Sequence, residues 1–513
     1  MGAASPASGR GCDEGAAHEL ARPGHQLRQP GGGRPPCPRP LAGGGCSAAP
    51  GTSTRGAGRG RRTEGWRVTG ASANAETRTQ LSLLRNRCRD LAQNNAYAAR
   101  AVAVIAHNTV GAGIIPRIEG SNEAKRKRAA RLVKDWLDTP LCDADGRNHF
   151  YGLQALVIRT VAESGEALIR RRWRRPSDGL PVPMQLQVLE PDLLDSGKDG
   201  PLPNGNLCQQ GIEVDRLGRR VAYWLFDDHP GDGVRLRTLA SKPIPAADVI
   251  HVYRQDRPGQ MRGVPWGAPV IIRLRDFADY EDAQLLRQKI AACFAVFVHD
   301  DDSGPGSPSP SQGGDLLEEI GPGIVEHLPP GRDVRFAVPP GVDGYVDYSR
   351  VSLTAVAAGY GVTYEALTGD LSGVNFSSGR MGWLEMARNI DAWQWNMLIP
   401  QLCAGVWGWM VEASPIAGLG LEGVTASWTP PRREMIDPVK ETEAIREGVR
   451  SGLYTQSEAI RRQGYDPETV FLERAAELKR MRELGIAFDT DPAVKPGATP
   501  PPAAPGGASD TTA

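Results

Sequence analysis

The chain has 513 residues, with 60 basic and 60 acidic side chains and a formal net charge of +0 at pH 7. A protein that coats nucleic acid without sequence preference carries a clear positive excess, so the composition excludes that class and limits any DNA contact to a local one. The 61 glycines and 42 prolines concentrate in particular stretches, which indicates folded segments joined to disordered ones.

The eight cysteines are scattered, and no two of them have the C-x-x-C spacing of a zinc ribbon or a thioredoxin-like motif. Isolated cysteines fit a reducing compartment. The sequence contains no apolar run of about 18 residues, and its N-terminus lacks the apolar core of a secretory signal. We therefore expect a cytoplasmic protein, or one that belongs to a particle assembled there.

The first 64 residues consist mainly of Gly, Pro, Ala, Ser and Arg, and such a stretch cannot bury enough apolar surface to offset its chain entropy. Three interpretations stay open: a disordered arm, a translation start placed too early or in a shifted frame, and a basic arm that binds DNA. At the other end, 490–513 is a Pro/Ala/Gly segment that we expect to be disordered.

Order is expected to begin near Thr77. Apolar residues recur at nearly helical spacing from Leu84 to Ile105, and this helix should stop before Gly111. A second predicted helix, 122–137, carries lysines and arginines along one side. A solvated helix face explains these charges, and contact with DNA or an acidic partner is the alternative.

A third helix is predicted at 149–163, followed by a series of strands within 166–255. The segment 167–173 has the pattern of an exposed strand, and 184–189 follows it as a second strand. Further on, Gly218 stands at the turn of a predicted hairpin. We therefore expect a small β-rich module inserted between helices.

A long helix is predicted at 267–298, because neither proline nor glycine interrupts the chain after Pro269. About 30 residues would span ~45 Å. One-sided apolar residues and charges of both signs favour lateral packing against neighbouring subunits, although a helix that spans one domain would look similar. The candidate packing residues are Val270, Leu274, Phe277, Leu286, Ile290 and Phe294.

Beyond a Ser/Pro/Gly insert at 301–314, the sequence predicts a helix at 351–360 and a tryptophan-rich helix after 368–378 that Pro400 could kink. Core packing explains the tryptophans best, and a platform that stacks on bases is the alternative. The start of that helix also has two interpretations. Either Ser377 or Ser378 caps it, or its small residues form an anion site with Arg380.

The C-terminal part reads as three capped helices. Asp437 and Pro438 open the first, because proline suits the first helical position. Thr455 and Glu458 form a capping box for the second, and Asp466 begins the third.

A search for catalytic motifs finds no phosphate-binding G-x-x-x-x-G-K-[ST] loop, no G-x-S-x-G elbow and no H-E-x-x-H pair. The sequence at 143–146 resembles a fragment of a calcium loop, but the ligands that should follow are absent, which favours a turn at a helix end. We therefore predict that the chain is not an enzyme, and we assign no catalytic, cofactor-binding or metal-ligating residue.

Six segments, in this order, resemble the lambda-type portal family of tailed phages, the head-tail connectors. They are 89–101, 163–168 (ESGEAL), 189–194 (LEPDLL), 211–213 (GIE), 257–266 (RPGQMRGVPW) and 367–378 (LTGDLSGVNFSS). The resemblance extends from about Gly65 to Asp489, and it fails before about Arg59, which supports the interpretation of an early start. The motif residues are Gln260, Arg262, Gly263, Pro265, Trp266, Gly369, Asp370, Ser372, Gly373, Asn375 and Ser377.

The resemblance implies an α+β portal-type fold with a helical stem, a β-rich clip, a mixed α/β wing and a helical C-terminal crown. We expect the helices in 149–298 to form the stem and 166–255 the clip. The loop 335–349 is a candidate to face the tunnel. The remaining parts are the N-terminal extension (1–64), an N-terminal wing part (65–148), the wing (299–432), the crown (433–489) and the tail (490–513).

The resemblance further implies a ring, typically a dodecamer, at one vertex of the capsid, with double-stranded DNA passing through it during packaging and ejection. Its implied partners are further copies of the chain, the terminase large subunit, the major capsid or scaffold protein and the head-completion proteins. It implies no cofactor and no membrane contact. Two alternatives stay open: a packaging-cluster enzyme such as a terminase or maturation protease, and a scaffold protein that conducts no DNA.

Overall fold

The computed structural model describes residues 69–232, 240–292, 344–433 and 435–486, and the backbone of two strands at 296–300 and 332–336. The chain divides into two units, Met1–Thr69 and Gly70–Ala513, and the second holds all the described elements. The predictions for 1–64, 301–314 and the tail 490–513 lie outside the described residues.

Helices and antiparallel sheets share the fold, which confirms the predicted α+β class. The α-helices are α1 (Ala73–Thr77), α2 (Leu81–Asn94), α3 (Ala96–Val110), α4 (Glu123–Leu132), α5 (Phe150–Ser164), α6 (Ile271–Ala292), α7 (Tyr345–Tyr360), α8 (Tyr364–Thr368), α9 (Phe376–Trp393), α10 (Ala404–Ala413), α11 (Pro438–Arg450), α12 (Gln456–Arg462) and α13 (Pro467–Leu484). Two π-helices, η2 (Val133–Leu137) and η8 (Gln394–Cys403), and the 3₁₀ helices η3 (Pro140–Cys142), η4 (Pro176–Asp178), η5 (Pro191–Leu193), η6 (Ala246–Asp248) and η7 (Ala268–Val270) complete the helical elements.

The strands form four antiparallel sheets with the orders β1-β12, β10-β11, β3-β2-β9 and β4-β5-β6-β7-β8. Their bounds are β1 (Ile115–Glu119), β2 (Glu166–Trp173), β3 (Met184–Leu189), β4 (Gly200–Pro201), β5 (Leu207–Gln209), β6 (Ile212–Val214), β7 (Arg220–Leu225), β8 (Lys242–Pro245), β9 (Val249–Tyr253), β10 (Val296–Asp300), β11 (Arg332–Phe336) and β12 (Thr425–Thr429).

The N-terminal helix expected as one element is two helices. The side chain of Asn95 accepts hydrogen bonds from the backbone N–H groups of Tyr97 and Ala98 at 3.0 and 3.1 Å, and so caps α3 and separates it from α2. The predicted stop at Gly111 is confirmed, because Gly111 is the C-cap of α3.

The expectation that 167–173 is an exposed strand was wrong. Strand β2 is the central strand of its sheet, paired with β3 on one side and β9 on the other, and its first four residues are buried. Its three arginines suggested solvent exposure, but Arg171 is only 6% exposed, because Asp248 and Glu412 accept its hydrogen bonds. The predicted hairpin turn at Gly218 is confirmed between β6 and β7.

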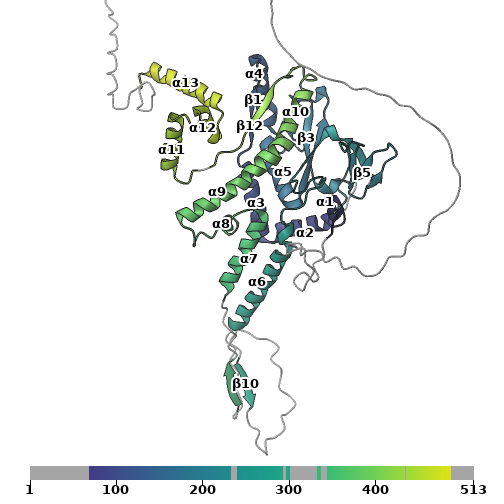
Figure 1. Ribbon diagram of the computed structural model, residues 1–513, viewed down its shortest axis with the longest axis vertical. Helices are drawn as coiled ribbons and strands as arrows, with labels where there is room; N and C mark the ends of the chain where they lie inside the picture. The colour runs from purple at the N-terminus through teal and green to yellow at the C-terminus, as the bar shows by residue number, and fades with distance from the viewer. Residues whose placement is uncertain are drawn as a thin grey trace, which may run out of the picture. The chain divides into compact units, whose positions relative to one another are not determined.

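The long predicted helix is shorter than expected: α6 ends at Ala292, and its 22 residues span ~33 Å. Helix α7 lies beside it (Figure 1). Tyrosines join the two helices, with ring centroids 4.5 Å apart for Tyr280 and Tyr348 and 6.0 Å apart for Tyr280 and Tyr345.

The partner of α6 is not the helix that we expected. We expected the helix at 149–163 to pair with it, but α5 packs against α3 and β2 within the body of the protein. The β-rich segment 166–255 packs against the same part of the chain, since β2 contacts α5 and β9 contacts η8. Strands β10 and β11, which pair with each other, are the elements that stand between α6 and α7 in the sequence. Part of the candidate tunnel loop, 345–349, belongs to α7.

The large hydrophobic core lies among α3, α5, the β2 sheet and the continuous helical segment α9-η8-α10. Pro400 lies inside π-helix η8, where the altered hydrogen-bond pattern accommodates its missing N–H. Most tryptophans of this region are buried, which confirms core packing for Trp393, Trp407 and Trp409, whereas Trp395 is 53% exposed. In the described part of the chain no helix is long and apolar enough to span a membrane.

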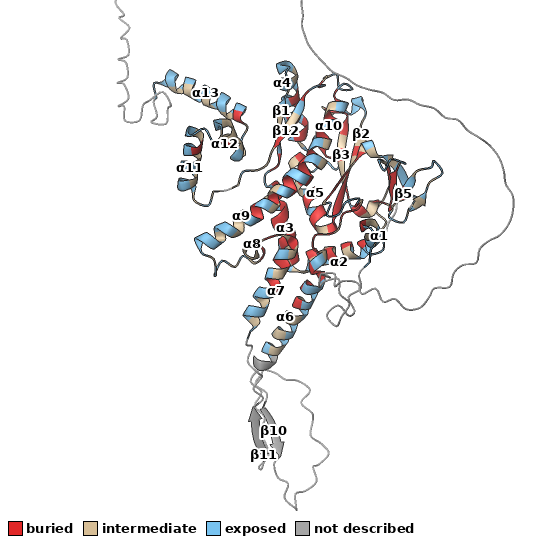
Figure 2. Cartoon of the chain, in the orientation of Figure 1, coloured by how far each residue is buried: buried red, intermediate tan, exposed pale blue. Residues whose placement is uncertain are grey.

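The three C-terminal helices are confirmed, but the capping box predicted at Thr455 is only half formed, because the Glu458 carboxylate accepts hydrogen bonds from Arg461 and Arg462 instead. Asp437, Thr455 and Asp466 each accept a hydrogen bond from a backbone N–H in the first turn of α11, α12 and α13 respectively. Helix α13 is exposed along nearly its whole length (Figure 2), with Pro467 as its only buried residue.

Candidate functional site

A buried carboxylate, Glu166, lies at the start of β2 and organises the region around the 257–266 motif. Its Oε1 accepts hydrogen bonds from Arg85 Nη2 at 3.1 Å and from Arg262 Nε and Nη2 at 2.9 and 2.5 Å. Its Oε2 accepts from His251 Nε2 at 2.9 Å and from the Gly263 backbone N–H at 2.8 Å. One carboxylate thus joins α2, β2, β9 and the motif loop, and we call these five residues the Glu166 network.

The motif arginine, Arg262, is fully buried. Besides Glu166, it reaches two acceptors with Nη1, which donates to Ser196 Oγ and to the Gln210 carbonyl oxygen at 3.0 Å each. All of its contacts lie inside the chain, so its role in this structure is to hold the loop to the body. A buried arginine is stable only when it is fully paired in this way.

The motif glutamine, Gln260, shapes the turn before Arg262. Its Oε1 accepts hydrogen bonds from the backbone N–H groups of Asp256 and Arg257 at 2.9 and 3.1 Å, and its Nε2 donates to the Arg262 carbonyl oxygen at 2.8 Å. The hydroxyl of Tyr253 donates to the Gln260 carbonyl oxygen at 2.8 Å. The turn therefore has little freedom in the folded chain.

Two glycines meet where the motif loop crosses the end of α5. A Cβ atom on Gly263 would lie 2.1 Å from the carbonyl oxygen of Gly165, and one on Gly165 would lie 2.6 Å from the Pro265 nitrogen. Gly165 also has φ +92°, a backbone conformation that residues with a side chain rarely adopt. Glycine is therefore required at both positions, and this explains why the motif contains Gly263.

The motif ends in the core at Trp266, whose backbone N–H donates to the Ala162 carbonyl oxygen at 3.1 Å. The indole is 1% exposed and packs against Trp393 with ring centroids 4.8 Å apart. The motif loop therefore links the Glu166 network to the large hydrophobic core.

Burial alone would raise the pKa of the Glu166 carboxyl group, but Arg262 and the hydrogen bond from His251 outweigh it and hold the pKa well below its usual range. Burial lowers the pKa of His251. His251 is therefore neutral at pH 7 and donates its Nε2 proton to Glu166. Its Nδ1 has no hydrogen-bond partner in the described chain, which suits an unprotonated nitrogen.

The second motif, 367–378, spans the end of α8, a short and mostly exposed loop at 369–375 and the first turn of α9. Asn375 caps α9 by accepting a hydrogen bond from the Ser378 N–H at 2.8 Å, and Ser378 Oγ accepts one from the Asn375 N–H at 3.1 Å. The prediction that Ser377 or Ser378 caps this helix was wrong in its residue: Asn375 is the cap, and Ser378 completes the capping box from within the first turn. Ser377 lies exposed in the first turn of α9.

The remaining motif residues fix the loop conformation. Gly369 ends α8 with φ +76°, and Asp370 accepts hydrogen bonds from the Ser372 N–H at 3.0 Å and the Tyr364 hydroxyl at 3.2 Å. A Cβ on Gly373 would lie 2.9 Å from Arg350 Nη2 on α7. The loop is held by its own polar groups, and its apolar side chain Leu371 is 66% exposed.

The structure separates the candidate packing residues of the long predicted helix into two groups. Val270, Leu274 and Phe277 are buried within the chain itself, whereas Leu286 is 60% exposed. The side chains of Ile290 and Phe294 lie outside the described residues.

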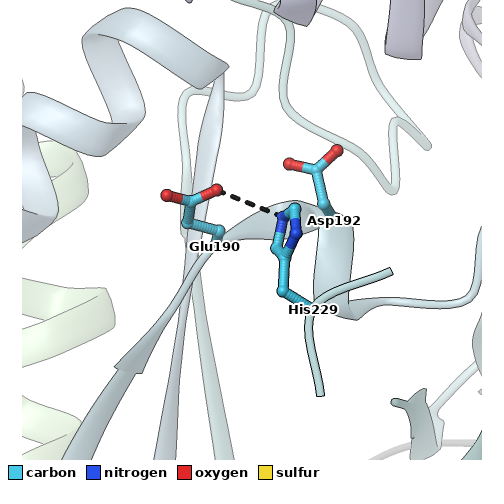
Figure 3. Close-up of side chains that lie close together, drawn as sticks. All are labelled: Glu190, Asp192 and His229. Carbon is cyan, nitrogen blue, oxygen red and sulfur yellow. Dashed lines mark ion pairs between the residues drawn. The ribbon is translucent and has the colours of Figure 1, made fainter. Parts of the chain in front are cut away.

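Three potential metal ligands that the sequence did not suggest converge beside η5: Glu190, Asp192 and His229 (Figure 3). His229 Nε2 lies 3.5 Å from Glu190 Oε2. However, Arg89 Nη2 lies 2.5 Å from Asp192 Oδ2 and 3.1 Å from Glu190 Oε2. The guanidinium already supplies the positive charge that these carboxylates need, so we assign no metal here. The cluster was not predicted, because His229 is far from Glu190 and Asp192 in the sequence.

Sequence comparison identifies the family of this chain. The family model described as "Phage portal protein, lambda family" matches residues 59–394. The chain is 28% identical over 426 residues to a probable portal protein of Halomonas phage phiHAP-1, a match that covers 79% of this chain and 81% of that protein. It is 22% identical to portal protein B of Escherichia phage lambda, over 84% of this chain and 90% of that one.

Among solved structures, the neck of an empty gene transfer agent particle matches with a TM-score of 0.44 and 15% identity, over 76% of this chain and 94% of that one. The class defined by the sequence comparison is that of structural proteins of phage virions. The chain belongs to the lambda family of phage portal proteins.

Proposed function

We propose that this portal protein assembles into a closed ring, typically of twelve copies, at one vertex of the capsid. Double-stranded DNA passes through the ring during packaging and ejection. The observation that supports the ring is that apolar side chains stay exposed on both α6 and α7. They are Ile272 (73%), Leu286 (60%), Val346 (75%) and Val351 (66%).

Exposed apolar side chains on paired helices need a partner, because leaving them in water forfeits the free energy of their burial. Charges of both signs lie on the same helix, with Arg275 paired to Asp279 at 3.4 Å along the surface of α6. Another copy of the chain, carrying the same mixture, is the partner that suits such a face in a symmetric oligomer.

We assign the stem of the portal to α6 and α7, and the clip to the segment between them that contains β10 and β11. This assignment rests on a stem of paired helices with a clip inserted between them, which is the pattern that the family resemblance implies. Within the described chain, α6 and α7 are the pair with such an insertion. In this assignment the β-rich segment 166–255 belongs to the wing, and α11 to α13 form the crown.

The balance of 60 basic and 60 acidic residues suits a conduit. Each phosphate that a protein neutralises releases counterions and adds binding affinity, which would slow DNA that has to move. A ring without a large positive excess avoids that cost.

The proposed partners are the terminase large subunit, the major capsid or scaffold protein and the head-completion proteins. In this proposal assembly takes place in the bacterial cytoplasm, and the chain itself catalyses no reaction. The packaging ATPase resides in the terminase.

The test is negative-stain electron microscopy, combined with mass measurement by light scattering, on a chain beginning at Gly65. Rings with a central hole and a mass of about twelve copies are expected. A chain that stays monomeric with purified capsid and scaffold proteins present would contradict the ring. ATP hydrolysis or DNA cleavage by the purified chain alone would contradict the non-enzymatic role.

A further inference from the structure

A pocket of about 650 Å³ lies between the five-stranded sheet and the 257–266 loop. Its lining includes Gln209 from β5, Arg220 from β7, Tyr253 from β9, and Gln255 and Gln260 from the segment that leads into the motif. Polar side chains with hydrogen-bond donors thus line part of the pocket, beside the apolar side chains of Leu207, Val214 and Met261.

Arg220 is the charged side chain that distinguishes this pocket. Its Nη1 donates to the Tyr223 hydroxyl at 3.2 Å and its Nη2 to the Tyr253 hydroxyl at 2.6 Å. In the described part of the chain, no carboxylate lies within 4.0 Å of its guanidinium, and the acceptors of its two side-chain hydrogen bonds are phenol hydroxyls. Arg220 is half-buried, so this cation has lost part of its hydration without gaining a counter-charge.

The carboxylates around Glu166 do not neutralise the positive charge of Arg220. Glu166 is paired with Arg85 and Arg262, Asp192 with Arg85 and Arg89, and Glu190 with Arg89. These three carboxylates are therefore already paired with three other guanidinium groups, and none of them forms an ion pair with Arg220 in the described chain.

We propose that this pocket binds the carboxylate of an aspartate or glutamate presented by an acidic segment of a partner protein. A carboxylate pairs with a guanidinium through two parallel hydrogen bonds, and the neighbouring carboxamide groups of Gln209 and Gln255 can donate to the same oxygens. The bound carboxylate supplies the charge that Arg220 lacks.

A protein carboxylate fits this pocket better than the backbone of DNA does. Arg216 and Asp215 also line the pocket, and Arg219 pairs with Asp215 at 2.8 Å. Binding to a DNA backbone relies on cations arranged in a row along a surface, whereas this pocket combines two arginines with one paired carboxylate. The site therefore differs from the conduit proposed above, and it can be tested independently of ring formation.

The experiment measures the fluorescence anisotropy of a labelled hexaglutamate peptide with the full chain at low ionic strength, and repeats it with a labelled DNA duplex. Wild type should bind the peptide, and Arg220→Gln should weaken binding by at least about tenfold, as expected for loss of a charge-assisted pair. The control is Arg87→Gln, which removes the same charge from an exposed residue of α2 that does not line the pocket. It should change affinity by less than about twofold.

Thermal melting of each variant separates loss of binding from loss of fold, and Arg220→Lys, which keeps the charge without the planar fork, should bind with intermediate affinity. Absence of peptide binding to wild type would overturn the proposal. So would equal losses in the two glutamine variants, since they would indicate nonspecific attraction. Tighter binding of the DNA duplex through Arg220 would show that the site serves nucleic acid instead.

Discussion

The Glu166 network and the α6/α7 pair lie in the same unit, but they differ in the kind of side chain that they bury and expose. Around Glu166, charged residues such as Arg262 are completely buried and paired inside the chain. On α6 and α7, apolar residues such as Leu286 and Val351 face outward. The first region is satisfied by its own chain, whereas the second would be covered by another copy of the chain in the proposed ring. Substitutions should therefore affect folding in the first region and assembly in the second.

The largest expected effect is the loss of the central charge. Glu166→Gln would leave Arg262 and Arg85 buried without their counter-ion, which costs about 3–5 kcal/mol in the free energy of unfolding. Urea unfolding followed by circular dichroism measures this difference. A variant within 1 kcal/mol of wild type, roughly the size of a surface ion pair, would show that the network is not essential to the fold.

A pair of matched substitutions on α6 tests the contrast directly. Leu274 is fully buried in the chain, so Leu274→Asp should prevent folding, because it places a charge in the core. Leu286 is 60% exposed, so Leu286→Asp should melt like wild type but fail to form rings. Melting curves and electron microscopy of both proteins provide the measurement. Intact rings of the Leu286 variant would exclude this face from the interface.

A smaller effect is expected from pH. The pKa of His251 is lowered in the fold, so below about pH 6.5 the unfolded chain binds a proton that the folded chain does not, and stability falls as pH falls. The depressed pKa of Glu166 adds a further loss below about pH 4.3. In melting temperatures measured from pH 7.5 to 5, His251→Asn should show a flatter curve than wild type. Parallel curves would mean that His251 does not cause the decline.

The smallest expected effect is at the exposed 367–378 loop. Asn375→Ala removes the cap of α9 and should cost about 1 kcal/mol. Thermal or chemical unfolding detects this change. Ser377→Ala is the matched control, because its side chain is exposed next to the cap without being the cap residue. Equal losses in the two variants would contradict the assignment of Asn375 as the cap.

Local signals in the sequence predicted much of the fold. Caps at Asp437, Thr455 and Asp466 located the three C-terminal helices, since a capping residue acts within one turn. The stop at Gly111 was predicted for the same reason. The break at Asn95 was missed, because apolar spacing continues across it and only the side-chain hydrogen bonds of Asn95 reveal the cap.

Long-range features could not be predicted in this way. The partner of α6 depends on contacts made by Tyr280 with residues more than sixty positions away, and periodicity within α6 contains no information about them. The Glu166 network is similar: the sequence comparison with the portal family marked Gln260, Arg262 and Gly263, but nothing local indicated that they close around Glu166. Arginines in β2 suggested exposure because their acidic partners come from distant segments.

The antiparallel register of β10 and β11 has a consequence for how this protein can change. Val296 pairs with Phe336 and Asp300 with Arg332, so the chain that leaves α6 comes back beside its own point of departure before it enters α7. Residues added or removed between Asp300 and Arg332 would not alter where the chain returns. A sequence could therefore be grafted there to recognise another protein while α6 and α7 keep their places.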